Sequence, residues 1–133
     1  MEEKFNESTI NRPKGDRLLD ASLVTIDLPA YIKQLKEEEA WQKNDRNAIT
    51  VFKTEGLNIV IVALHQDAVM KPPVASEGNT SVQVIEGSVL LNVEEQSTKI
   101  NPQQIVAFRE HQPFSITALK ETVFVLTMTD KED

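Results

Sequence analysis

The chain has 133 residues, enough to bury one hydrophobic core but too few for two. Its 14 Lys and Arg against 21 Asp and Glu give a net charge of -7, which disfavours binding to a nucleic-acid backbone or to an anionic membrane surface. There is no cysteine, so disulfide scaffolds, thiolate metal sites and cysteine nucleophiles are excluded.

The N-terminal segment, residues 1–17, is polar and lacks the apolar stretch of a secretory signal. We therefore predict a flexible tail over 1–17 and a single domain over 18–130. The longest apolar run, Ile59 to Leu64, is far shorter than the ~20 residues that cross a bilayer. We expect a cytoplasmic protein with no membrane and no nucleic-acid partner.

The first predicted elements are a strand and a helix. Residues 22–28 alternate apolar and polar side chains, which is typical of an edge strand with one covered face. Pro29 suits the first turn of a helix, and the following apolar residues are spaced as one stripe, so we predict a helix at about 29–43. The stripe consists of Tyr31, Ile32, Leu35 and Trp41.

An acidic run, Glu37 to Glu39, lies on this helix. A charge run on a short surface helix is usually a solvated face, so we assign it no function.

From Asn47 onward, runs rich in Val, Ile, Thr and Phe alternate with Gly, Asn, Pro and acidic residues about every 8–12 positions, which predicts an all-β sandwich or barrel. We place turns at Glu55-Gly56, Glu86-Gly87, Glu95-Gln96 and Lys120-Glu121. The predicted strands are 48–54, 58–65, 80–86, 88–94, 97–100, 104–109, 113–119 and 122–129.

Two of these strands are apolar on both faces, Ile59 to Leu64 and Val123 to Leu126. Such a strand must be covered on both sides. The barrel interior covers one side, and the helix, the N-terminal strand or a second chain must cover the other. On this ground we expect a homodimer.

The order of elements resembles the cupin superfamily, in particular small single-domain bacterial cupins of the RmlC-like jelly-roll type, over about residues 18–130. The most recognisable segments are 46–54, 62–65, 81–87 and 112–116. The resemblance implies an all-β fold, a small double-stranded β-helix, with one short N-terminal helix.

Metal-binding cupins resemble G-x5-H-x-H-x3,4-E-x6-G in a first motif, whose His and Glu side chains point inward at one ion. Aligned on Gly87, the motif puts its Glu on Thr80, its two His on Val74 and Ser76, and its first Gly on Ala68. None of these side chains is a good transition-metal ligand.

The second cupin motif resembles G-x5-P-x-G-x2-H-x3-N. Pro113 and Phe114 look like its Pro-His pair with the ligand replaced by a phenyl ring. The remaining motif positions also depart from the consensus, because they hold Gln103, Arg109, His111 and Ala118. The resemblance therefore implies a cupin without the usual metal ligands.

Another metal site is conceivable from the two histidines, His65 and His111, with Glu77 or Glu110. The simpler interpretation is a surface or rim imidazole that is hydrogen-bonded to the backbone or to a carboxylate. Four dispersed glycines exclude a phosphate-binding loop, and no G-x-S-x-G is present. We predict no cofactor and no catalytic residue.

By the same resemblance, alternate residues of two strands point into the barrel and form a largely apolar candidate ligand site. Lys71 and Arg109 are candidates to meet an anion at its rim. The inward residues are Thr80, Val82, Val84, Phe114 and Ile116.

Three functions stay open. The first is a metal-free, non-catalytic module that binds a small molecule or acts as a dimeric interaction domain. The second is a metal-dependent dioxygenase or isomerase with rearranged ligands. The third is a filled barrel with a purely structural role.

Overall fold

A computed structural model describes residues 21–71, 78–109 and 112–129. The predicted tail over 1–17 and the residues Val74, Ser76, Glu77, Glu110 and His111 lie outside this described part. The helices are α1 (Leu28–Glu37) and α2 (Glu39–Lys43). The strands are β1 (Arg46–Lys53), β2 (Leu57–Leu64), β3 (Val69–Met70), β4 (Thr80–Glu86), β5 (Val89–Val93), β6 (Gln96–Ile100), β7 (Ile105–Phe108), β8 (Phe114–Ala118) and β9 (Thr122–Thr129).

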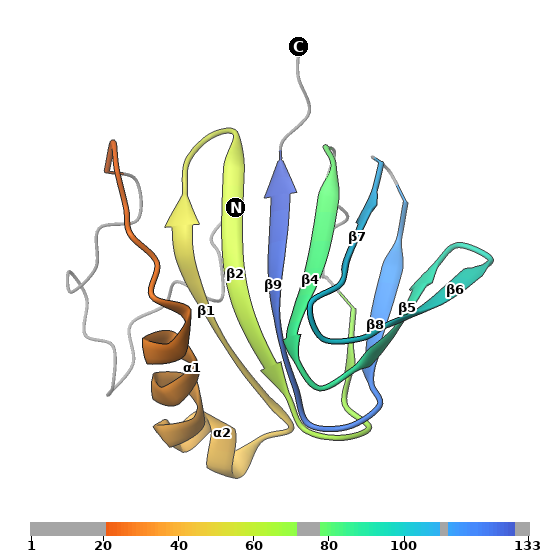
Figure 1. The fold of residues 1–133 in the computed structure, drawn as a ribbon, viewed down its shortest axis with the longest axis horizontal. Coiled ribbons are helices and arrows are strands. Elements are labelled where there is room, and N and C mark those ends of the chain that lie inside the picture. Colours follow the sequence, from red (N-terminus) through yellow and green to blue (C-terminus); the bar gives the residue numbers. More distant parts are fainter. Residues whose placement is uncertain (1–20, 72–77, 110–111, 130–133) are drawn as a thin grey trace.

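The strands form two antiparallel sheets around one apolar core (Figure 1). The large sheet has the order β1-β2-β9-β4-β7 and the small sheet the order β3-β8-β5-β6. This confirms the predicted all-β jelly roll, with every predicted strand from residue 48 onward in place. The structure adds β3, which was not predicted because two residues leave no readable alternation. One turn also differs: it lies at Glu94–Glu95, one residue before the predicted place, with Glu94 at a positive φ of 52°.

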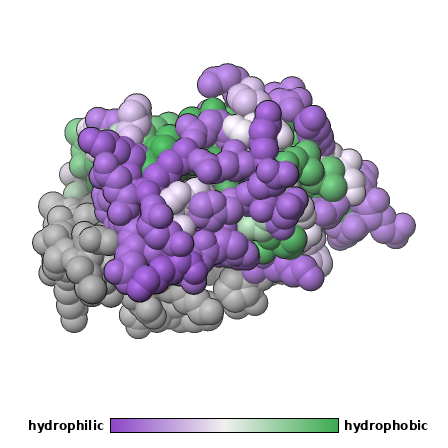
Figure 2. All heavy atoms as spheres, turned by 90° about the horizontal axis from the view of Figure 1, so that it is seen from below, coloured by the Kyte–Doolittle hydropathy of each residue, from purple (hydrophilic) through white to green (hydrophobic). Residues whose placement is uncertain are grey.

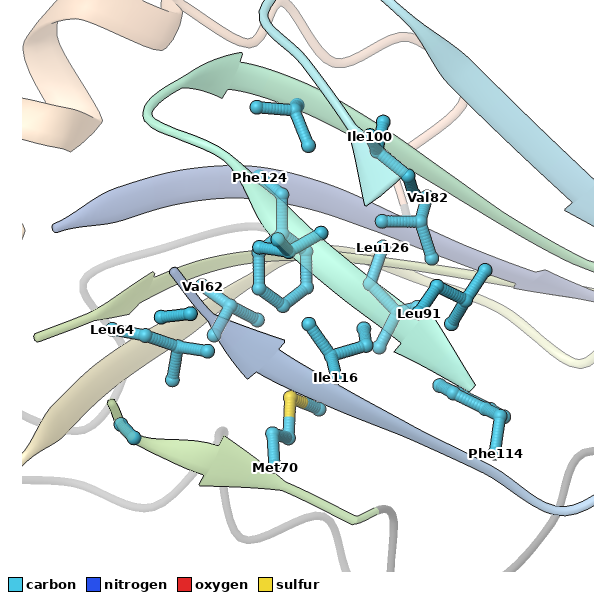
Figure 3. Close-up of a cluster of buried hydrophobic side chains, with 14 of the residues drawn as sticks. Val62, Leu64, Met70, Val82, Leu91, Ile100, Phe114, Ile116, Phe124 and Leu126 are labelled. Carbon is cyan, nitrogen blue, oxygen red and sulfur yellow. The ribbon is translucent and has the colours of Figure 1, made fainter. Parts of the chain in front are cut away.

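Side chains from both sheets meet in the middle of the barrel (Figure 3). Phe124 of the large sheet lies among Val62, Leu126 and the Ile116 side chain of the small sheet. We call the end at which β4 and β8 begin and β9 ends the mouth, and the opposite end the closed end. At the closed end the inward side chains are buried, among them Leu64, Val89, Ile100 and Ala118.

The outer side of the closed end is polar. The described side chains seen from this end are mostly hydrophilic (Figure 2). In the described part of the chain, no helix is long and apolar enough to cross a membrane.

The two helices cover the outer face of β1, β2 and β9. Leu35 and Trp41 pack there against Ile49, Ile61 and Val123 in a second buried cluster. The odd-numbered residues of β2 therefore face the helices, and the even-numbered residues face the barrel interior. Because the helices supply the cover that the two-faced strands need, this feature does not require a second chain. The homodimer stays a prediction.

The predicted helix at 29–43 is wrong in one respect, since it is divided into α1 and α2 at Glu38. Asp27 caps α1 by accepting a hydrogen bond from the Ala30 amide at 3.2 Å, with Pro29 in the first turn as predicted. Glu38 has the extended backbone angles φ -75° and ψ 150°, which end the helix.

The interpretation of the acidic run as a solvated face is wrong for Glu38, which is only 4% exposed. Its carboxylate accepts hydrogen bonds from Asn47 Nδ2 and Gln34 Nε2, each at 2.9 Å. Asn47 Nδ2 also donates to the Leu35 carbonyl at 3.0 Å. These bonds compensate for the burial of the carboxylate and hold the helix junction against β1.

The predicted edge strand at 22–28 is also wrong. Residues 21–27 form no strand, and Leu28 already belongs to α1. The alternation is real in burial, because Ile26 packs against the cluster under the helices whereas Leu23 is 85% exposed. Ile26 thus anchors an extended segment, and the alternation does not mark a strand.

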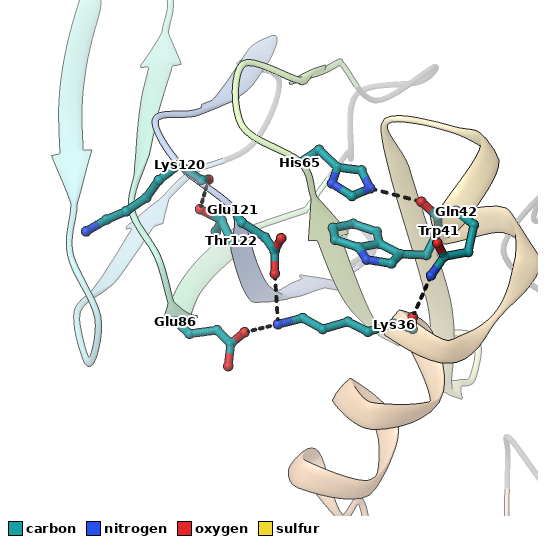
Figure 4. A network of polar contacts seen from close by, with 8 residues as sticks. All are labelled: Lys36, Trp41, Gln42, His65, Glu86, Lys120, Glu121 and Thr122. Atoms are coloured by element: carbon teal, nitrogen blue, oxygen red, sulfur yellow. Dashed lines mark hydrogen bonds and ion pairs between the residues drawn. The ribbon is translucent and has the colours of Figure 1, made fainter.

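A polar contact joins α1 to the closed end (Figure 4). Lys36 donates to Glu86, at the end of β4, and forms an ion pair with Glu121, just before β9, at 3.2 Å. Partial burial alone would lower the pKa of Lys36, but the hydrogen bonds and negative charges of Glu86 and Glu121 outweigh it and raise the pKa above 10.5.

Removing the buried leucine of α1 should destabilise the protein. Leu35→Ala is expected to lower the free energy of unfolding by about 2–5 kcal/mol, because Leu35 is fully buried and its loss leaves a cavity. Leu23→Ala is the matched control and should change it by less than about 0.5 kcal/mol. Equal effects of the two changes in urea unfolding would contradict the packing described for α1.

The Lys36 contact predicts a pH dependence. A lysine whose pKa is raised on folding stabilises the protein fully below its unfolded pKa, and this contribution is lost as the pH rises through the folded pKa. Lys36→Met should therefore lower stability by less than about 1 kcal/mol at pH 7, since the carboxylates are half exposed. The difference from wild type should shrink above the ordinary lysine pKa of 10.5. A difference that grew with alkaline pH, measured by thermal unfolding, would rule out this role.

Candidate functional site

A row of inward side chains crosses the large sheet at the mouth. Strand register pairs Lys53 with Asn58, Asn58 with Met128, Met128 with Thr80 and Thr80 with Phe108. Residues that pair directly across antiparallel strands share a face of the sheet. Met128 and Phe108 pack against the interior cluster, so the whole row faces the barrel.

Phe114 closes this row from the small sheet. Its ring meets the Phe108 ring edge-on, with centroids 4.9 Å apart and planes inclined by 66°. We call the residues of the row together with Phe114 the mouth ring. Thr80 and Phe114 are nearly buried, at 4% and 8% exposed, whereas the remaining members are half exposed. The mouth ring consists of Lys53, Asn58, Thr80, Phe108, Phe114 and Met128.

The layers below the mouth ring are sealed. The next row is apolar apart from Thr50, which pairs with Val60. Val82, Val84 and Phe124 are each 0% exposed, so no space for a water molecule adjoins them. The predicted inward placement of the interior residues is therefore observed, but only Thr80 and Phe114 of that set reach the mouth. Whether any of them binds a ligand stays a prediction.

The predicted rim cations lie at the mouth but outside the mouth ring. Lys71 directly follows β3 and Arg109 directly follows β7, and both strands run toward the mouth. Both residues are exposed. The side-chain amide of Gln112 donates a hydrogen bond to the backbone carbonyl of Arg109 at 2.9 Å. The Arg109 guanidinium takes no part in this bond.

The described residues do not fit a cupin metal centre. Of the implied ligand positions, Thr80 and Phe114 are described, and they offer one hydroxyl and no ring nitrogen or carboxylate. Within residues 21–71, 78–109 and 112–129, no group of three His, Cys, Asp or Glu side chains could hold a metal ion.

His65 lies at the closed end, on the residue after β2 and far from Phe114 along the barrel. Its ring stacks on Trp41 with centroids 3.5 Å apart, and its Nε2 is 2.9 Å from the Trp41 carbonyl oxygen (Figure 4). This confirms the interpretation of a backbone-bonded imidazole. His65 joins α2 to the barrel and is remote from the mouth ring.

Two mouth residues were not found from the sequence, Asn58 and Lys53. Asn58 could have been found, because a period of two places it on the same side as Val60 and Val62. Lys53 could not, because the register shifts between Thr50 and Phe52 and turns Lys53 to the inner side.

The mouth predicts a large effect of one substitution. Phe114→Ala should lower the free energy of unfolding by about 3–5 kcal/mol, because it removes a buried ring and its contact with Phe108. Phe52→Ala is the control, since Phe52 is half exposed and belongs to neither buried cluster, and its effect should be clearly smaller. A loss below about 1 kcal/mol for Phe114→Ala in denaturant unfolding would mean that the ring is not packed as described.

Comparison of the sequence with known proteins finds no matching family model and no matching curated protein. Comparison of the structure finds many similar folds. A cupin superfamily protein from Desulfitobacterium hafniense superposes with a TM-score of 0.62 at 10% identity, covering 66% of this chain and 80% of that one. A conserved protein of unknown function from Streptococcus pyogenes has a TM-score of 0.65 at 10% identity, covering 90% and 99%.

The cupin domain of an XRE-family transcriptional regulator from Enterobacter cloacae is also similar, with a TM-score of 0.59 at 16% identity over 68% of this chain and all of that domain. At these identities the likeness concerns the fold alone. The two sheets, their order and these similarities together lead to one conclusion. The described part of this chain has the cupin, RmlC-like jelly-roll fold.

Proposed function

We propose that this chain is a non-catalytic cupin module that binds a small organic molecule at the mouth ring. The observation that carries the proposal is the contrast between two adjacent layers of the barrel. The mouth ring combines half-exposed apolar side chains with an amide, a hydroxyl and an ammonium group. The layer beneath is sealed around Val82 and Leu126. A ligand can therefore enter only as far as the mouth ring.

The composition of the mouth ring supports binding without catalysis. It contains no carboxylate and no imidazole, which are the groups that most often transfer protons or hold metal ions. Apolar walls with a few polar groups are typical of small-molecule sites. Lys71 and Arg109 follow strands that run to the same end, and we include them as outer cations that attract an anionic ligand.

A structural barrel without a ligand is the second candidate, and the sealed interior favours it. In that case the protein acts through its outer surface, as a homodimer or with another protein. Ile105 of β7 is 60% exposed on the side of the large sheet that points away from the core, where such a contact could form.

A ligand screen separates the two candidates. Small acids, amides and aromatic compounds are tested for a rise in melting temperature, because a ligand that binds only the folded state stabilises it. We expect at least one stabiliser that also shifts the methyl resonance of Met128. Thr80→Val should weaken its binding, and Thr117→Val, on the outer side of β8, should not.

Two outcomes would contradict the proposal. A screen with no stabiliser, or with stabilisers that leave the Met128 methyl resonance unchanged, would favour the structural barrel. Stoichiometric iron, manganese, nickel or zinc in the purified protein, lost on replacing His65, would favour a metal-dependent enzyme.

A further inference from the structure

We propose that Asn58 Oδ1 is the hydrogen-bond acceptor that selects the ligand, and that the ligand carries an N–H or O–H donor next to an anionic group. This inference rests on the proposed function and names the class of molecule that the mouth ring would take.

The starting observation is a buried acceptor without a partner. Asn58 Oδ1 is buried and makes no hydrogen bond with the described residues 21–71, 78–109 and 112–129. Buried polar groups are almost always paired, because loss of water without a new hydrogen bond is unfavourable. A donor from a molecule outside the chain would compensate for this loss.

The position of Asn58 fits that role. Its side chain lies on the inner side of β2, between Lys53 and Met128 in the mouth row, with Thr80 one strand beyond Met128. Neighbouring strands are ~4.8 Å apart, so a molecule of a few bonds can span from Asn58 to either side. Asn58 is thus a polar group within the mouth row, with an ammonium group on one side and a thioether on the other.

The neighbours of Asn58 define the rest of the ligand. Lys53 lies on the same inner side and carries three donors, so it can bind a carboxylate in addition to any contact within the chain. Met128 and the paired rings of Phe108 and Phe114 supply an apolar wall suited to an aromatic or branched group. The class is therefore an N-acylated amino acid or a hydroxy acid with an apolar body.

A matched pair of probes tests the donor. Hippurate has an N–H between its phenyl ring and its carboxylate, and O-benzoylglycolate has an oxygen at that position. By NMR titration of the full chain, wild type should bind hippurate about fivefold more tightly than O-benzoylglycolate, which corresponds to one hydrogen bond. Asn58→Leu should abolish the preference.

Asn92→Leu is the control variant. Asn92 lies on the outer side of β5 and accepts a hydrogen bond from Ser97 Oγ at 2.6 Å. This variant should keep the preference for hippurate. The ligand-free proteins give an independent measurement, because Asn58→Leu removes an unpaired buried acceptor and should raise the melting temperature, whereas Asn92→Leu removes a hydrogen bond and should lower it.

Several results would overturn the inference. Equal binding of the two probes by wild type, or an unchanged preference in Asn58→Leu, would remove Asn58 from ligand selection. A lower melting temperature of Asn58→Leu would mean that the acceptor is already paired. Failure of hippurate to bind wild type would reject the ligand class. The proposed function would survive that failure if another compound shifted the Met128 methyl resonance, and it would fall with it otherwise.

Discussion

The packing of Phe124 against Ile116 in the middle of the barrel is the contact on which the other features depend. It brings the two sheets together and leaves no space beside Val84. Interiors packed in this way do not admit water or a ligand without a change in side-chain positions. A ligand that enters the barrel can therefore contact only groups at the mouth, and this constraint places the proposed site there.

The large sheet can hold this core because the outer face of β1, β2 and β9 is covered as well. Leu35 and Trp41 bury the outer side of β1 and β2, and the buried Glu38–Asn47 contact fixes the junction between the two helices. Strands that are apolar on both faces thus lie between two clusters of the same chain. At the surface, Lys36 joins α1 to Glu86 and Glu121 at the closed end.

The cupin fold fixes where a site can lie but not what it does. The mouth is where the resemblance places metal ligands, and this chain has Thr80 and Phe114 there. A hydroxyl and a phenyl ring leave a surface suited to an organic molecule. Asn58 and Lys53 come from strands that carry no motif position, so the amide and the ammonium group of the proposed site lie on another wall of the barrel.

The sequence was informative wherever local periodicity decides the structure. Regular alternation in β4 and β8 put Thr80 and Phe114 on one face with their apolar neighbours, and the resemblance to cupins turned that face inward. The sequence was less informative where contacts between residues that are not neighbours in the chain determine which side chains are buried. The burial of Glu38 depends on Asn47, nine positions away, and the inner placement of Lys53 depends on a shift of register near Val51 that no residue type marks. Asn58 was overlooked although a period of two places it on the side of Val60 and Val62, because a strand that is apolar on both faces does not mark which side is inner.

The most direct measurement is a crystal structure of the protein with the strongest stabiliser bound. The account predicts density for that molecule inside the mouth ring, with a donor atom about 3 Å from Asn58 Oδ1, above a dry layer formed by Val82 and Leu126. A compound bound elsewhere on the protein, ordered water reaching Phe124, or a metal ion coordinated beside Thr80 would contradict it.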